Sequence, residues 1–282
     1  RFVCEGEGGY TRLVEQVLRY GVLTPNRTGV DTKVCIDTAI HWDLRGMAVP
    51  LLQTKSVAWK RNVMNELCWF LSGSTDEKAL AATGCEIWRA NAAEASARLG
   101  YPEGVLGPVY GHQWRNSGAP YIVDDVMAAR DGAPLEFTGV DQIQNLVEGI
   151  LRSPSSRRLI VSSWDADQGA MALPPCHHVF QVNVLGDDLH LSVRMRSADL
   201  GLGVPYNLAS YGFLAHALGI LTGHAVAKLT LTMCNSHVYV NHEGALWEQV
   251  SRPQRGLTRP SVTFPDSVTL DAIKKMRAAV LA

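Results

Sequence analysis

A short stretch of the chain combines several side chains that could act together in catalysis. Between Ala172 and Leu208, these are Cys176, Arg196, Ser197, Asp199 and Asn207. A thiol attacks only as the thiolate, and a neighbouring guanidinium lowers the pKa of the thiol because it favours the charged form. Pro174 and Pro175 fix two backbone torsions directly before Cys176, which favours a rigidly held side chain. The stretch therefore predicts a nucleophilic cysteine assisted by Arg196, which could also hold an anionic ligand.

The pattern of this stretch also predicts the elements that position these groups. Val179–Leu185 and Leu189–Met195 alternate apolar and polar residues and are separated by Gly186, Asp187 and Asp188, which is typical of a β-hairpin. A glycine-rich turn then ends at Asn207, where an apolar helix is expected to begin. Side chains at element ends can converge on one cavity.

Two other interpretations of Cys176 compete with this one. Free cysteine is among the most buried residue types, so the thiol could be a small core residue. A cysteine hydrolase would need His177 or His178 as its base. Neighbouring residues of a strand point to opposite faces, so neither histidine is a natural base for this thiol.

The composition excludes several classes of protein. The chain has 282 residues, of which 46% are hydrophobic and 19% charged, so it can bury a large core and is not expected to be disordered. A net charge of −1 argues against a surface that coats nucleic acid. An anionic ligand must then be held by local arginines, which suits a small phosphate ester.

The cysteines and the most apolar segment indicate a cytoplasmic protein without metal. The six cysteines are scattered and form no CxxC pair, which argues against a zinc site or a disulfide framework. The apolar stretch Leu208–Thr222 is short and interrupted by polar residues, so it is expected to be a core helix rather than a membrane span.

Hydrophobic periodicity predicts the remaining elements. Helices are expected at Tyr10–Tyr20, Ala58–Leu71 and Val140–Leu151, and strands at Lys33–Trp42 and Lys228–Val240. Glu66 lies between apolar neighbours in the second of these helices. It is either turned outward or buried, and burial would raise its pKa toward the range useful for acid–base catalysis.

Five further charged or polar residues could bind a ligand or have no such role. Arg27 lies among turn-forming residues, and Arg157 and Arg158 precede an expected strand; all three could be solvated surface charges. His237 and Tyr239 are two residues apart in a strand and therefore lie on one face. Such a pair could equally be an ordinary structural contact within the sheet.

Seven ordered segments resemble the thymidylate synthase family, which includes the pyrimidine-nucleotide hydroxymethylases. They read NRTG from Asn26, ELCWFLSG from Glu66, LGPVYGHQWR from Leu106, SRRLIVSSWD from Ser156, PPCH from Pro174, RSADLGLGVPYNLASY from Arg196 and NSHVYVNH from Asn235. The resemblance extends from about residue 10 to about residue 255.

This resemblance implies the fold and the reaction. The fold would be α+β, with a large mixed β-sheet flanked by helices and dimerisation through the sheet. Residues 1–282 would form a single catalytic domain with a surface insertion at about 116–138. The enzyme would transfer a one-carbon group from 5,10-methylenetetrahydrofolate to C5 of a pyrimidine nucleoside monophosphate through a covalent bond between Cys176 and C6. No membrane, nucleic acid or metal would be required.

The resemblance also implies roles for individual residues. The catalytic residues would be Cys176, Glu66, Tyr110, Arg196 and Asn207. The substrate-binding residues would be Arg27, Arg157, Arg158, Arg196, Ser197, Asn207, His237 and Tyr239. The residues that contact the folate would be Trp88, Asp199, Gly203 and Lys55. Arg157 and Arg158 would complete the site of the partner in a homodimer, and the amide of Asn207 favours uracil over cytosine.

Departures from the synthase pattern favour hydroxymethylation over methylation. Met195 replaces a usual Gln, Asn91 replaces an aromatic residue, Ser56 replaces a basic residue, and the chain ends in MRAAVLA rather than an apolar tail. A more polar, less sealed folate side would admit water. Methylation of dUMP to dTMP, hydroxymethylation of CMP or dCMP, and an inactive nucleotide- or RNA-binding homologue remain as alternatives. The spacing from Lys55 to Glu66 is one residue longer than in the family.

Overall fold

The computed structural model describes residues 3–167, 169–253 and 260–264. The chain divides into two compact units. One combines Arg1–Val57 with Cys176–Phe264, and the other contains Ala58–Pro175. The expected C-terminal tail lies outside the described residues.

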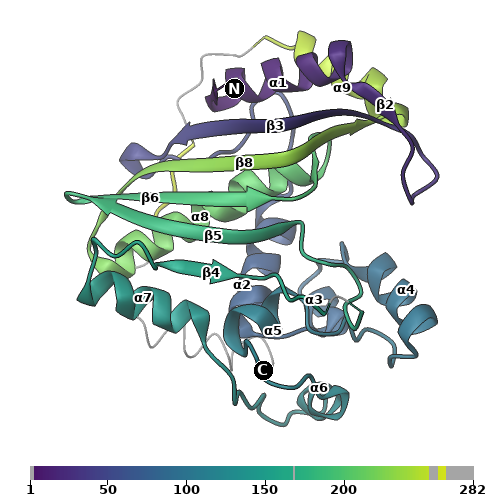
Figure 1. The fold of residues 1–282 in the computed structure, drawn as a ribbon, viewed down its shortest axis with the longest axis vertical. Coiled ribbons are helices and arrows are strands. Elements are labelled where there is room, and N and C mark those ends of the chain that lie inside the picture. Colours follow the sequence, from purple (N-terminus) through teal and green to yellow (C-terminus); the bar gives the residue numbers. More distant parts are fainter. Residues whose placement is uncertain (1–2, 168, 254–259, 265–282) are drawn as a thin grey trace. The chain divides into compact units, whose positions relative to one another are not determined.

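The first unit is built on a mixed sheet (Figure 1). Its strands are β1 (Val3–Glu5), β2 (Val22–Thr24), β3 (Thr32–Asp43), β5 (His177–Leu185), β6 (Asp188–Met195), β7 (Ala198–Asp199) and β8 (Ala225–Tyr239). Strands β1, β3, β8, β6 and β5 lie side by side in this order, while β2 pairs with β3 and β7 pairs with β8. β8 is antiparallel to β3 and parallel to β6. The expected α+β class with a large mixed sheet is confirmed.

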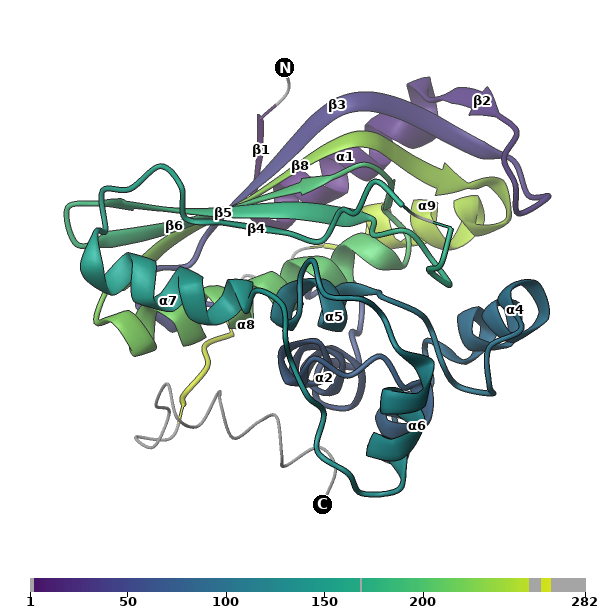
Figure 2. The ribbon, with the colours of Figure 1, turned by 60° about the horizontal axis from the view of Figure 1, so that its bottom comes forward.

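The helices of this unit are α1 (Gly6–Tyr20), α8 (Gly203–Thr222) and α9 (Glu243–Ser251), with short 3₁₀ turns η1 (Arg45–Met47) and η3 (Val240–His242). Figure 2 shows α8 against one face of the sheet. Along β8, Leu229, Leu231 and Met233 are fully buried, whereas the flanking Lys228 and Cys234 on the opposite face are exposed. This alternation gives the sheet one apolar face and one more polar face.

The hairpin is confirmed, but the helix after it begins earlier than expected. β5 and β6 pair antiparallel from His177 and Met195 to Leu185 and Asp188, with Gly186 at a φ of 62° in the turn. α8 begins at Gly203 rather than at Asn207. Pro205 explains the difference, because proline is tolerated in the first turn of a helix, where its missing N–H has no intrahelical partner.

The second unit is mainly helical. It contains the π-helix η2 (Trp59–Met64), α2 (Asn65–Ser72), α3 (Glu77–Ala82), α4 (Arg89–Leu99), α5 (Tyr110–Arg115), α6 (Val123–Arg130), α7 (Gln142–Arg152) and the short strand β4 (Ile160–Ser162). Helix α6 lies within the stretch 116–138, for which the family resemblance implies a surface insertion. Buried aromatic rings of Trp69, Phe70, Trp88, Tyr110 and Trp114 form the centre of the unit, with neighbouring ring centroids 4.7–6.5 Å apart.

The expected helix Ala58–Leu71 is therefore two segments, a π-helix followed by an α-helix. A π-helical turn accommodates one residue more than an α-helical turn. The α-helix that follows it ends at Gly73, which adopts the left-handed conformation.

Candidate active site

The thiol of Cys176 lies at the beginning of the hairpin, next to Arg196. The Arg196 Nη2 atom is 3.9 Å from the Cys176 Sγ atom. The Arg196 backbone N–H donates to the Cys176 carbonyl oxygen over 2.9 Å, so the main chain fixes this proximity. Burial raises the pKa of the Cys176 thiol, while the positive charges of Arg196 and Arg27 lower it and Asp199 raises it further. The expected thiol–guanidinium pair is present, and Arg27 is close enough to act on the same sulfur.

The loop that carries Arg27 is ordered by its neighbour Asn26. The Asn26 Oδ1 atom accepts hydrogen bonds from the backbone N–H and the hydroxyl of Thr28, at 2.8 and 2.7 Å, and its amide donates to the Val30 carbonyl over 2.7 Å. Such an Asx turn sets the direction of the chain without using Arg27 itself. The Arg27 side chain stays exposed and accessible to an anion.

A second set of predicted residues gathers where β7 meets α8. Asp199 Oδ1 accepts the Gly201 N–H over 2.8 Å. A Cβ atom placed on Gly203 would lie 3.7 Å from Asn207 Oδ1 and 3.8 Å from the Asp199 Cβ atom. Gly203, Asn207 and Asp199, which the family resemblance predicts in one site, therefore lie close together.

His237 and Tyr239 extend this group along β8. Their ring centroids are 5.5 Å apart in an edge-to-face arrangement, and Asp199 stands opposite His237 in the β7–β8 register. The His237 Nδ1 atom is 2.9 Å from Asn235 Oδ1. Burial lowers the pKa of His237, opposed by Asp199, so its ring is neutral near pH 7 and can act as a hydrogen-bond donor or acceptor.

Sequence reasoning missed Glu7, which positions Lys55. The buried Glu7 carboxylate accepts hydrogen bonds from the Gln53 and Thr54 N–H groups and from the Thr54 hydroxyl, at 2.7–2.9 Å. Lys55 follows directly, and its Nζ donates to the Gly201 carbonyl. The sequence offers only a weak signal for this role, an acidic residue in the first turn of a helix.

The other unit holds Glu66, Trp88 and Tyr110. The Trp88 indole Nε1 donates to Glu66 Oε1 over 2.7 Å, and the Trp88 and Tyr110 rings are 6.1 Å apart. Burial raises the pKa of Glu66 to about 7, opposed by the Trp88 hydrogen bond. Glu66 is half-buried, and its carboxylate faces Trp88, so the interpretation in which it is turned outward is wrong. The hydrogen bond from Trp88 to this carboxylate was not predicted.

The two remaining predicted arginines, Arg157 and Arg158, are exposed and lie in a turn before β4. The Arg158 N–H donates to the Ser156 hydroxyl over 3.2 Å and the Ile160 N–H donates to the Arg158 carbonyl over 2.9 Å. The backbone of the turn is thus fixed while both residues remain exposed.

The described residues contain no cluster of His, Cys, Asp and Glu suited to a metal ion. Among the same residues, no helix is both long and apolar enough to cross a membrane. Among the described residues, the thiols of Cys35, Cys68, Cys85, Cys176 and Cys234 are not joined in disulfides.

The chain is similar to known proteins over most of its length. The family described as thymidylate synthase matches residues 8–280. The chain is 40% identical over 267 residues to thymidylate synthase of Ascaris suum, and the aligned residues cover 93% of this chain and 87% of the relative. It is 43% identical over 261 residues to thymidylate synthase of equine herpesvirus 2, covering 91% and 86%. It is 39% identical over 255 residues to human thymidylate synthase, covering 89% and 79%.

These matches define the class of protein as one-carbon transferases of nucleotide biosynthesis. Within that class, the chain belongs to the thymidylate synthase family, as its motifs suggested. This family acts on a nucleotide with methylenetetrahydrofolate as co-substrate.

The expectation of hydroxymethylation is not supported. The relatives are named thymidylate synthases, so methylation, the stated alternative, fits better. The structure weakens one of the arguments for hydroxymethylation, because Met195 is 1% exposed. Its side chain adds to the apolar core and does not make the folate side more polar.

Proposed function

We propose that the chain is a thymidylate synthase that methylates dUMP to dTMP. The observation that carries this proposal is the contact between Cys176 and Arg196 at the open end of the β5–β6 hairpin. The relatives of the chain are named thymidylate synthases. The expected nucleophile and the group that stabilises its anion are thus within contact distance.

In this proposal, each residue has a separate task. The Cys176 thiolate adds to C6 of the uracil ring, which makes C5 nucleophilic. Arg196 lowers the free energy of forming the thiolate. With Arg27 and Ser197, it also holds the phosphate dianion. Asn207 donates to one carbonyl of uracil and accepts from its ring N–H.

The folate supplies the carbon and the hydride. Lys55, Asp199, Gly203 and Trp88 are proposed to bind it; Gly203 lies beside Asp199 and Asn207. His237 and Tyr239 are proposed to bind the sugar.

Glu66 is suited to proton transfer around C4 and C5. Its pKa of about 7 lets it give or accept a proton near neutral pH, which is the optimum for a general acid or base. Tyr110, whose ring lies beside that of Trp88, is proposed to assist it.

A homodimer completes the proposal. The face of the sheet that carries Lys228 and Cys234 is the proposed contact between protomers, and Arg157 and Arg158 of each protomer are proposed to reach the phosphate in the site of the other. We further propose that residues 1–282 act as one catalytic domain.

Covalent trapping tests the role of Cys176. Incubation with 5-fluoro-dUMP and methylenetetrahydrofolate should give a stoichiometric covalent complex by intact mass, and Cys176→Ala should abolish it. Failure of the unmodified chain to form the complex would favour the inactive nucleotide- or RNA-binding homologue.

Product analysis tests the reaction itself. With dUMP, the mass of the nucleotide should increase by one methylene unit while dihydrofolate absorbance appears. A hydroxymethyl product without dihydrofolate would overturn methylation, and turnover of CMP or dCMP in place of dUMP would overturn the choice of base.

A further inference from the structure

A cavity of about 410 Å³ lies between α3 and α4, and the proposed reaction uses none of its residues. Its lining residues are Glu77, Lys78, Ala81, Arg89, Ala92, Ala93, Glu103 and Gly104. On the α4 side, the lining consists of Arg89, Ala92 and Ala93. Residues three and four positions apart lie on the same side of a helix. Methyl groups therefore leave open a space that larger apolar side chains would fill.

Glu77 is a buried carboxylate that the protein leaves incompletely satisfied. Its side chain is 7% exposed, and its Oε1 atom has no hydrogen-bond partner among the described residues. Arg89 Nε approaches this oxygen only to 3.9 Å, because the same guanidinium makes its close contact, 2.8 Å, with Glu86. A buried charge without a hydrogen bond is costly, so this oxygen is a ready acceptor for a ligand.

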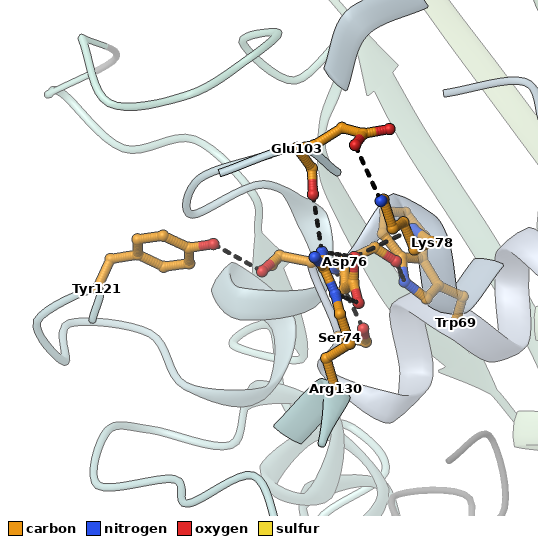
Figure 3. A network of polar contacts seen from close by, with 8 residues as sticks. Trp69, Ser74, Asp76, Lys78, Glu103, Tyr121 and Arg130 are labelled. Atoms are coloured by element: carbon orange, nitrogen blue, oxygen red, sulfur yellow. Dashed lines mark hydrogen bonds and ion pairs between the residues drawn. The ribbon is translucent and has the colours of Figure 1, made fainter. Parts of the chain in front are cut away.

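The walls of the cavity are fixed by a polar network (Figure 3). Asp76 receives two hydrogen bonds from Arg130, at 2.9 and 2.6 Å, and Arg130 also donates to the Glu103 carbonyl over 3.0 Å. Lys78 Nζ is 3.1 Å from Glu103 Oε2, and the Glu77 N–H donates to the Gly104 carbonyl over 2.8 Å. The network holds the start of α3, the loop before Gly104 and the end of α6 together, so the cavity is pre-formed.

Gly104 shows how closely these groups are packed. Its φ is +88°, and a Cβ atom there would lie 2.8 Å from Lys78 Cγ and 3.0 Å from Arg130 Nη2. The cavity is therefore bounded on this side by a contact that only glycine permits.

We propose that this cavity binds a small aliphatic amine, whose ammonium group is held by Glu77. An ammonium supplies both the missing N–H donor and the missing positive charge at the buried oxygen. The methylene chain would lie against Ala81, Ala92 and Ala93. Glu103, 85% exposed at the rim, accepts a second ammonium in a diamine.

The local charges favour a cation over an anion. Of the two cations that line the cavity, Lys78 is paired with Glu103 over 3.1 Å, and Arg89 makes its close contact, 2.8 Å, with Glu86 outside the lining. Glu77 is thus the lining carboxylate that neither cation approaches more closely than 3.9 Å. Burial raises the pKa of Glu77, and Asp76 and Glu86 raise it further against Arg89 and Lys78. A bound ammonium offsets this cost of ionisation.

Calorimetric titration with 1,4-diaminobutane at pH 8 tests the site. The unmodified chain should bind one equivalent with saturation, and n-butylamine should bind at the same place, whereas n-butanol, of the same length without charge, should not. Glu77→Gln should weaken binding of the diamine at least about tenfold, since it removes the charge and retains the shape.

Two further variants keep the test decisive if Glu77→Gln folds poorly. Ala93→Leu, at an exposed position on the cavity lining, should also weaken binding at least about tenfold by filling the space. Glu94→Gln, the next residue on α4 and not part of the lining, should bind as the unmodified chain does. Absence of saturable binding, equal binding of n-butanol, or equal loss in Glu94→Gln would overturn the proposal. None of these outcomes bears on the covalent trapping of the nucleotide.

Discussion

At position 176, burial and charge act on the thiol in opposite directions. Burial is the larger effect and raises the pKa of Cys176, while Arg196 and Arg27 lower it. The reactivity of the thiol therefore depends on its guanidinium neighbours, which a sequence can name but cannot place.

Replacing Arg196 tests this dependence. Arg196→Met should slow alkylation of Cys176 by iodoacetamide at pH 7.5 by roughly three- to tenfold, because less thiolate is present. The rate is measured by mass spectrometry of the peptide that contains Cys176, across a range of pH. Arg194→Met, exposed two residues earlier on β6, is the matched control and should leave the rate unchanged.

Glu66 illustrates the opposite case, a charge that the fold disfavours. Its pKa of about 7 exceeds the ordinary 4.5, so the folded state binds a proton more tightly than the unfolded state does. Between these two values, the unfolded state binds fewer protons. The free energy of unfolding therefore falls as the pH rises through this window.

Glu66→Gln should remove that loss while lowering turnover. Glutamine keeps an oxygen that can accept the Trp88 N–H and cannot ionise. The variant should match the unmodified chain in stability near pH 4.5 and exceed it by up to about 3 kcal/mol at pH 8. Urea unfolding at several pH values measures the difference. Equal stability curves would contradict it, and the exposed Glu94→Gln should show no such trend.

At the scale of elements, the close approach of two loops fixes the start of α5. Gly107 has a φ of +77°, and a Cβ atom there would lie 1.9 Å from the Ala170 carbonyl oxygen. The Ala172 N–H donates to the Leu106 carbonyl over 2.8 Å, which holds the two segments in contact. Tyr110, three residues after Gly107, begins α5.

Gly107→Ala should therefore destabilise the protein by at least about 3 kcal/mol, the sum of left-handed strain and a backbone clash. Gly118→Ala is the matched control, because its φ is +78° with no atom within 4 Å of the added Cβ. It should cost only about 1 kcal/mol. Denaturant unfolding of both variants separates strain from clash, and equal losses would show that the clash relaxes.

How far the sequence predicts this molecule depends on how local each signal is. The hairpin was predictable because alternation and the Gly186 turn lie within one short stretch. The beginning of α8 was not, because Gly203 and Pro205 resemble a turn until the helix that continues from them is seen. Glu7 and Glu77 gain their roles from residues far along the chain or on another helix, so their own neighbours in sequence carry little information.

At the scale of the whole molecule, the proposed exchange of arginines between protomers gives a testable consequence. Cys176→Ala and the double variant Arg157→Ala/Arg158→Ala should each be inactive alone. After the two are unfolded and refolded together, heterodimers would contain one intact site. With random pairing, about one quarter of the unmodified activity should return. No recovery in refolded mixtures with proven heterodimers would contradict the exchange.

The order of strands in the sheet also has a consequence for synthesis on the ribosome. β8 separates β3 from β6 and is the last long strand among the described residues. Until β8 (Ala225–Tyr239) has been synthesised, β3 and the hairpin cannot pair with their common neighbour, and loop closure over such separations is slow. The newborn chain therefore keeps unpaired strand edges until β8 has been synthesised, and this is the period in which a chaperone would protect it best.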